Sequence, residues 1–231
     1  MFNPNEQLLD SASIPGLKKY AVKTFAWMTL GLLITTVVAF AIYSSNIVYY
    51  LYESGFIPLI LLVAQLGVAI ALAARLMKMS VAGTKFLFLT YSVLTGITFS
   101  VLGLVYLPGT LAAAFLITTV YFGSLTVIGY TTKMNLLRFG PILFVGLLSL
   151  IIVEIIFMLM GADTSTMAFS VVGLLLFTGL TAYDVQKLKA LYLSYEGDAE
   201  MQNKLSIYSA FQLYLDFINI FLYILRFLDK D

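Results

Sequence analysis

The 231-residue chain is 61% hydrophobic and only 11% charged, which excludes an ordinary soluble domain, where these fractions are about 45–50% and about 25%. Its formal net charge of +1 provides no basic patch for nucleic acid. Because the chain contains neither cysteine nor histidine, disulfides, haem ligation through imidazole and the usual zinc sites are excluded, and any ion must be a proton or a hard cation held by oxygen, such as Ca²⁺ or Mg²⁺.

The first 23 residues are polar and lack the features of a secretory signal, so they predict a short cytoplasmic arm. Seven apolar segments follow, each long enough to cross about 30 Å of hydrocarbon as a helix. We therefore predict an all-α integral membrane protein with one seven-helix transmembrane domain over residues 24–228 and a tail at 229–231. The expected spans are 24–44, 56–76, 84–107, 110–131, 140–160, 167–188 and 206–228.

Lysine and arginine residues fall in alternate connections, and those after the first, third and fifth spans contain none. The positive-inside rule therefore places the N-terminus and the even-numbered connections in the cytoplasm. The C-terminal end of the chain also carries Arg226 and Lys230, which leaves open a seventh segment that crosses only partly. The residues that establish the alternation are Lys18, Lys19, Lys23, Arg75, Lys78, Lys85, Lys133, Arg138, Lys187, Lys189 and Lys204.

Three carboxylates lie inside predicted spans: Glu154 in the fifth, Asp184 in the sixth and Asp216 in the seventh. Burying an aspartate at mid-membrane costs about 2.5–3.5 kcal/mol, so such residues are expected to be functional or paired. Glu154 has no polar neighbour at helical spacing. Its partner must come from another helix, or the group is protonated.

Asp216 belongs to a polar stripe whose members recur every three or four residues on the seventh span. This spacing predicts a polar pathway facing protein or water, and the alternative is a hydrogen-bonded seam that only joins helices. The stripe consists of Ser209, Gln212, Asp216, Asn219 and Tyr223.

Asp184 is expected near the cytoplasmic end of its span, about four residues deep, where a side chain reaching the headgroups is the alternative. Asp216 is about ten residues deep, so the sequence alone does not bring the two together. If they meet, two carboxylates in a low-dielectric site would repel and share a proton, acting as a pH sensor. Arg75 is a candidate latch for Asp184, or an ordinary positive-inside charge.

Two motifs give the chain a resemblance to a known family. They are FTGLTAYDVQKLK, from Phe177 to Lys189, and FQLYLDFINIFLYILRFL, from Phe211 to Leu228. A Tyr-Asp pair ending the sixth span, followed by Asp-Phe-Ile-Asn and Leu-Arg-Phe in the seventh, resembles the Bax inhibitor-1 family, whose size and seven spans fit nearly the whole chain.

The resemblance implies a seven-helix bundle with a central seventh helix and a pH-sensitive calcium leak through the membrane. Asp184 and Asp216 would be its sensing pair and transient Ca²⁺ ligands. The implied partners are the lipid bilayer, Ca²⁺ as the permeant ion and H⁺, with no tightly bound cofactor and no enzymatic activity. We expect a bacterial plasma (inner) membrane.

Two other functions use intramembrane carboxylates. A proton-coupled transporter is one, although the sequence shows no inverted repeat. An intramembrane aspartyl protease is the other, but such enzymes carry Gly-x-Gly before the second aspartate, where this chain has Leu213, Tyr214 and Leu215. A regulator that binds other membrane proteins leaves no sequence signal.

Overall fold

The computed structural model describes residues 14–53, 55–160 and 166–229, and every regular element in these ranges is helical. Seven helical segments are long and apolar enough to cross a membrane, which confirms the predicted all-α membrane architecture. The elements are α2 (Leu17–Ser44), α3 (Ile47–Glu53), α4 (Ile57–Arg75), α5 (Val81–Phe99), α6 (Leu102–Val105), α7 (Pro108–Thr131), η2 (Leu136–Phe139), α8 (Gly140–Met160), α9 (Met167–Ser194) and α10 (Ala199–Leu228).

The chain divides into two compact units. The first consists of Met1–Ile14, Gly109–Ala190 and Leu215–Asp231, and so contains most of α7, α8 and α9 with the C-terminal half of α10. The second consists of Pro15–Pro108 and Leu191–Tyr214, and contains α2 to α6 with the N-terminal half of α10. The single helix α10 therefore contributes to both cores.

The second unit is held together by close helix contacts and buried hydroxyl groups. Gly96 of α5 lies so near the backbone of Thr35 on α2 that a methyl group would not fit. The Thr35 hydroxyl donates to the carbonyl of Ser92 (2.9 Å) and lies 2.7 Å from the Tyr214 hydroxyl. Phe88 packs edge-on against the Tyr214 ring. Small residues and paired hydroxyls thus replace the hydrophobic effect, which cannot drive helix association in lipid.

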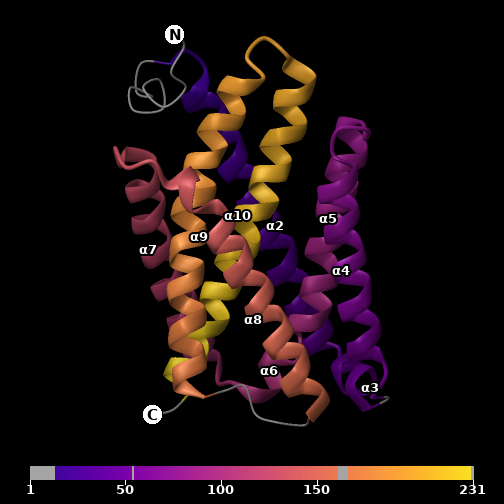
Figure 1. The fold of residues 1–231 in the computed structure, drawn as a ribbon. Helices are drawn as coiled ribbons and strands as arrows, with labels where there is room; N and C mark the ends of the chain where they lie inside the picture. The colour runs from indigo at the N-terminus through magenta and orange to yellow at the C-terminus, as the bar shows by residue number, and fades with distance from the viewer. Residues whose placement is uncertain (1–13, 54, 161–165, 230–231) are drawn as a thin grey trace. The chain divides into compact units, whose positions relative to one another are not determined.

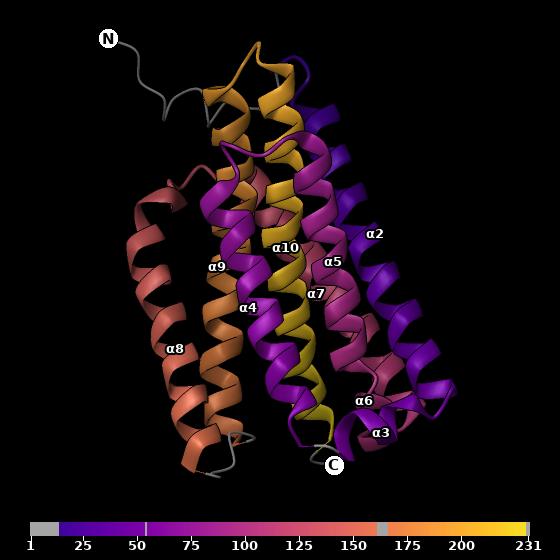
Figure 2. The same ribbon diagram turned by 90° about the vertical axis from the view of Figure 1, so that its right-hand side faces the viewer.

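The first unit packs α7 and α8 against α9. Gly129 of α7 faces the backbone of Ala182, and Gly140 at the start of α8 faces the ring of Tyr183. Figures 1 and 2 show α8 and α9 as neighbouring helices, and in Figure 1 they diverge toward the end of α8. The absence of a side chain at each glycine allows the close approach that fixes α9 between its neighbours.

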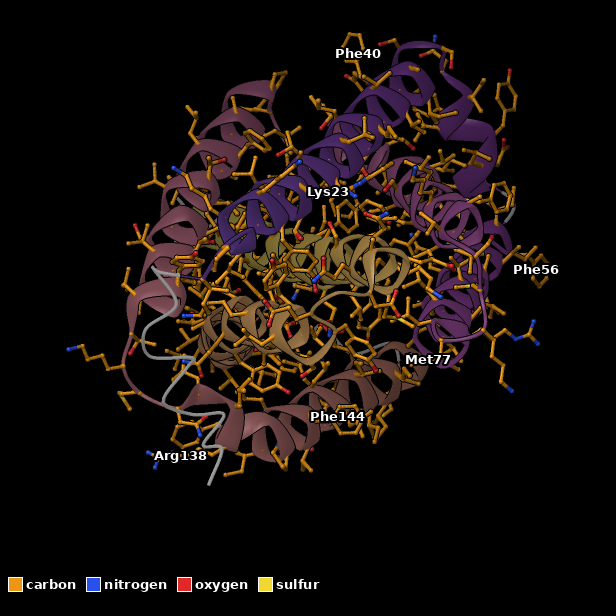
Figure 3. The ribbon with its side chains drawn as sticks, turned by 90° about the horizontal axis from the view of Figure 1, so that it is seen from above. Lys23, Phe40, Phe56, Met77, Arg138 and Phe144 are labelled. Carbon is orange, nitrogen blue, oxygen red and sulfur yellow. The ribbon has the colours of Figure 1, made fainter. Side chains whose placement is uncertain are left out.

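The outward surfaces of both units are apolar. Phe40 of α2, Phe144 of α8 and Phe56, just before α4, are each more than half exposed and point outward (Figure 3). Many further large apolar residues are exposed on α2, α4, α7 and α8. Such a surface is unsuitable for water and fits the hydrocarbon of a bilayer, so the chain is an integral, multi-pass membrane protein.

Several helices extend beyond the predicted spans. Helix α2 begins at Leu17 rather than residue 24, α9 ends at Ser194 rather than 188, and α10 begins at Ala199 rather than 206. The predicted third span, 84–107, is interrupted after Phe99. Hydropathy detects only the apolar part of a helix, whereas the backbone helix continues into the headgroup region where charged side chains are hydrated.

Helix α10 is continuous over 30 residues, or about 45 Å, and is the most buried of the seven spans. Its length is sufficient for a complete crossing, so Arg226 does not require a segment that crosses only partly. Its burial agrees with the expected central seventh helix.

Candidate functional site

Asp184 and Asp216 lie together inside the first unit. Asp184 is on α9 and Asp216 on α10, both are buried, and their charges act on each other. Thr181, one turn before Asp184 and fully buried, contacts the Asp216 carboxylate through its side chain. Among the described residues, no group donates a hydrogen bond to Oδ2 of Asp216. The site therefore contains two carboxylates that are withdrawn from water, and one oxygen of Asp216 is not satisfied.

Helix α9 extends further beyond Asp184 than the predicted span does. The helix continues to Ser194, so Asp184 is ten residues from its end, whereas the predicted span ended four residues after it. The residue is only 8% exposed, which does not fit a carboxylate that reaches out to the headgroups. The depth of Asp184 in the membrane stays a prediction.

Asp184 has a cationic neighbour on its own helix. The Lys187 Nζ lies 3.9 Å from Asp184 Oδ1 and 5.6 Å from the centre of the Tyr183 ring. The sequence analysis treated Lys187 only as a positive-inside charge, although its i,i+3 spacing was a signal for this contact. Arg75 is exposed in the last turn of α4, within the second unit. Its predicted pairing with Asp184 stays a prediction.

Two further residues next to the aspartate anchor this end of α9, and the sequence analysis did not identify their roles. Gln186 accepts a hydrogen bond from the Leu136 amide (2.6 Å) and donates one to the Met134 carbonyl (2.8 Å). Lys189 donates to the carbonyl of Tyr130, in the last turn of α7, at 2.7 Å. Both side chains are buried. They fix the backbone around Asp184 to the end of α7 and to the connection that follows.

The predicted polar stripe is divided between the two units. Ser209 is buried and Gln212 half-buried in the second unit, whereas Asn219 and Tyr223 belong to the first. Asn219 donates its amide to the Leu215 carbonyl of its own helix at 2.7 Å. Tyr223 is buried. The stripe is thus a real face of α10, and its role as a pathway stays a prediction.

Glu154 is half-buried on α8, a different helix from those that carry the two aspartates. Its charge acts on Arg226, in the last turn of α10, and on Tyr223. Both alternatives for Glu154, a partner from another helix and a protonated group, stay predictions.

Comparison with known proteins finds a matching family. The profile of a family described as "Inhibitor of apoptosis-promoting Bax1" matches residues 17–231. The chain belongs to the Bax inhibitor-1 family. The expected family is therefore confirmed. The two motifs of the resemblance form the C-terminal part of α9 and most of α10, the helices that carry the two aspartates.

Relatives in the family match along nearly their whole length. The chain is 38% identical over 213 residues to the inner membrane protein YbhL of Escherichia coli K12, covering 91% of each chain. It is 37% identical over 214 residues to an uncharacterized protein of Rickettsia prowazekii, covering 92% of this chain and 90% of the other. A membrane protein of Streptococcus pyogenes is 26% identical over 237 residues. Sequence similarity to this chain thus extends to proteins of several different bacteria.

Proposed function

We propose that this Bax inhibitor-1 family member is a pH-sensitive calcium leak channel whose sensor is the pair Asp184 and Asp216. The observation that carries the proposal is that two buried carboxylates, one on α9 and one on α10, lie within electrostatic reach of each other. Ionisable groups inside a membrane are costly and are found where ions or protons pass. A pair in mutual electrostatic reach binds and releases protons as a unit, so its net charge depends on pH.

The contacts of the pair suggest how this charge controls the pathway. Asp184 lies next to the charged group of Lys187 on the same helix, α9. Helix α9 also contacts Asp216 of α10, through the side chain of Thr181. When the carboxylates are neutralised, the repulsion between them and the attraction of Lys187 for Asp184 are both lost, so the contact between α9 and α10 at this site changes with pH. Gln186 and Lys189 remain attached to the α7 end, so the movement is confined to the segment that carries the aspartates.

The oxygen ligands of the site support a hard cation as the permeant ion. Carboxylate and hydroxyl oxygens of Asp184, Asp216 and Thr181 are suited to replace part of the hydration shell of Ca²⁺. No group of three or more acidic side chains able to hold a metal ion occurs in the described parts of the chain. Two carboxylates without further acidic ligands suit brief contact during passage rather than tight storage. Calcium itself comes from the family resemblance.

We also propose the bacterial inner membrane as the location, with the N-terminus in the cytoplasm. The relative from Escherichia coli is named an inner membrane protein. The alternation of positive charges in the connections supports the orientation.

The test is Ca²⁺ flux into proteoliposomes that contain a calcium-sensitive dye. Wild-type flux is expected to rise as the pH is lowered from about 8 to about 6, because protonation neutralises the pair. Asp184→Asn and Asp216→Asn should each give a high flux that no longer depends on pH. Asp229→Asn, an exposed position just after α10, is the control and should behave as wild type.

Flux indistinguishable from that of empty liposomes at every pH would refute the channel. A flux that requires a proton gradient, and reverses with it, would instead identify a proton-coupled transporter. A pH response retained in both asparagine variants would show that the sensor lies elsewhere.

A further inference from the structure

A second polar cluster lies toward the C-terminal end of α10, within the first unit. It contains Glu154 of α8 and Tyr223 and Arg226 of α10. Tyr223 follows Asp216 by seven residues, or about 10 Å along the helix. An acid and a base inside the membrane are expensive to maintain, and the proposed sensing pair makes no use of them.

The ring of Tyr223 occupies a place that only glycine provides. A Cβ added at Gly173 of α9 would overlap the Tyr223 ring, with the phenol oxygen and Cζ as its nearest atoms. The Phe177 ring, one turn along α9, lies 6.0 Å from the Tyr223 ring. Tyr223 is only 3% exposed. Its ring therefore fills the space between α9 and α10 at this level.

Charged groups also lie next to the Tyr223 ring. The Arg226 guanidinium carbon lies 5.5 Å from the centre of the Tyr223 ring, and Glu154 acts electrostatically on both residues. Nη1 of Arg226 is buried and finds no hydrogen-bond partner among the described residues. A cation over a ring is a weak and non-directional contact compared with a bidentate ion pair, so the arrangement holds the ring without locking it.

We infer that Tyr223 is a second gate, seated on Gly173 and retained by Arg226 and Glu154, which closes the route from Asp216 to the C-terminal end of α10. Displacing an aromatic ring from a narrow apolar passage admits water, and with it a cation. This inference rests on the proposed function, but it concerns an occlusion whose presence is testable without calcium.

The absence of native cysteine makes that test direct. Asn219→Cys places a thiol between Asp216 and Tyr223 on the α10 stripe. Its reaction with a charged, membrane-impermeant thiol reagent is followed in spheroplasts and in inverted vesicles. Asp229→Cys, exposed beyond α10, identifies the preparation in which the C-terminal end of α10 faces the reagent.

In that preparation, the Asn219→Cys thiol should react slowly when Tyr223 is present. Adding Tyr223→Ala should accelerate the reaction about tenfold or more, because the ring no longer excludes water. Gly173→Ala should do the same by forcing the ring from its seat, and Glu154→Gln should have a smaller effect. Tyr223→Phe keeps the ring and should stay slow. Gly123→Ala, on α7 with no atom near the added Cβ, is the matched glycine control.

Equal rates in the Tyr223→Ala, Gly173→Ala and parent proteins, each with an unchanged gel-filtration profile, would overturn the gate. If the rates change as expected while wild type gives no Ca²⁺ flux, the gate stands and the calcium function fails. If wild type conducts Ca²⁺ with the pH dependence described above but the thiol rates do not change, the function stands and this inference fails.

Discussion

Replacing Gln186 by leucine should loosen the connection between α7 and α8 beside the aspartate pair. The substitution keeps the side-chain size but removes the acceptor for the Leu136 amide and the donor to the Met134 carbonyl. Each lost hydrogen bond costs about 0.5–1.5 kcal/mol, so the free energy of unfolding should fall by about 2 kcal/mol. For a chain of this size, that loss lowers Tm by roughly 5 °C.

Hydrogen exchange in detergent provides the sharper assay, because the neighbouring amide is an internal control. The Leu136 amide should exchange about 5 to 30 times faster in Gln186→Leu, as expected for a local loss of one to two kcal/mol. The Leu137 amide is held by the Asn135 side chain (3.1 Å) and should change much less. Gln202→Leu, at a half-buried position on α10, is the matched variant for Tm. Unchanged exchange at Leu136 would refute the assignment of Gln186 as the anchor.

Two more predictions concern helix contacts and are checked by thermal unfolding in detergent. Thr35→Val removes a partner of the buried Tyr214 hydroxyl and should lower the free energy of unfolding by about 1–3 kcal/mol. Thr36→Val, on the exposed face of α2, is the control and should change it by no more than about 0.5 kcal/mol. Equal effects of the two substitutions would contradict the hydroxyl pairing. Gly129→Ala forces a methyl group against the α9 backbone and should destabilise by about 1–3 kcal/mol. Gly123→Ala, on the same helix but facing open space, should raise the free energy of unfolding by about 0.5–1 kcal/mol. If both alanine substitutions changed the free energy of unfolding in the same direction, the close approach of α7 to α9 would be excluded.

Much of the architecture was predictable because hydrocarbon imposes strict requirements on sequence. Apolar runs of about 20 residues identify spans directly, and a carboxylate within such a run is conspicuous. Asp184 and Asp216 were therefore recognisable as candidates. The ends of α9 and α10 were not, because their polar flanks remain helical beyond the apolar runs and lack a hydropathy signal.

Contacts between helices were the part that sequence could not supply. Spacing along one helix shows which residues share its face, but not which residue of another helix they meet. Glu154 could not be matched with Arg226, nor Tyr223 with Gly173, without the packed helices. Gln186 was overlooked because its partners are backbone atoms, which no sequence pattern marks.

The unequal helix lengths within the second unit affect how it fits a bilayer. Helix α2 has 28 residues and α4 has 19, which correspond to about 42 Å and about 28 Å. A membrane whose hydrophobic thickness matches α4 leaves about 14 Å of α2 to tilt or to stand among the headgroups. Lipids with longer or shorter acyl chains therefore change the hydrophobic mismatch of these two helices by different amounts. Bilayer thickness thus affects the relative tilt of the two helices within this unit.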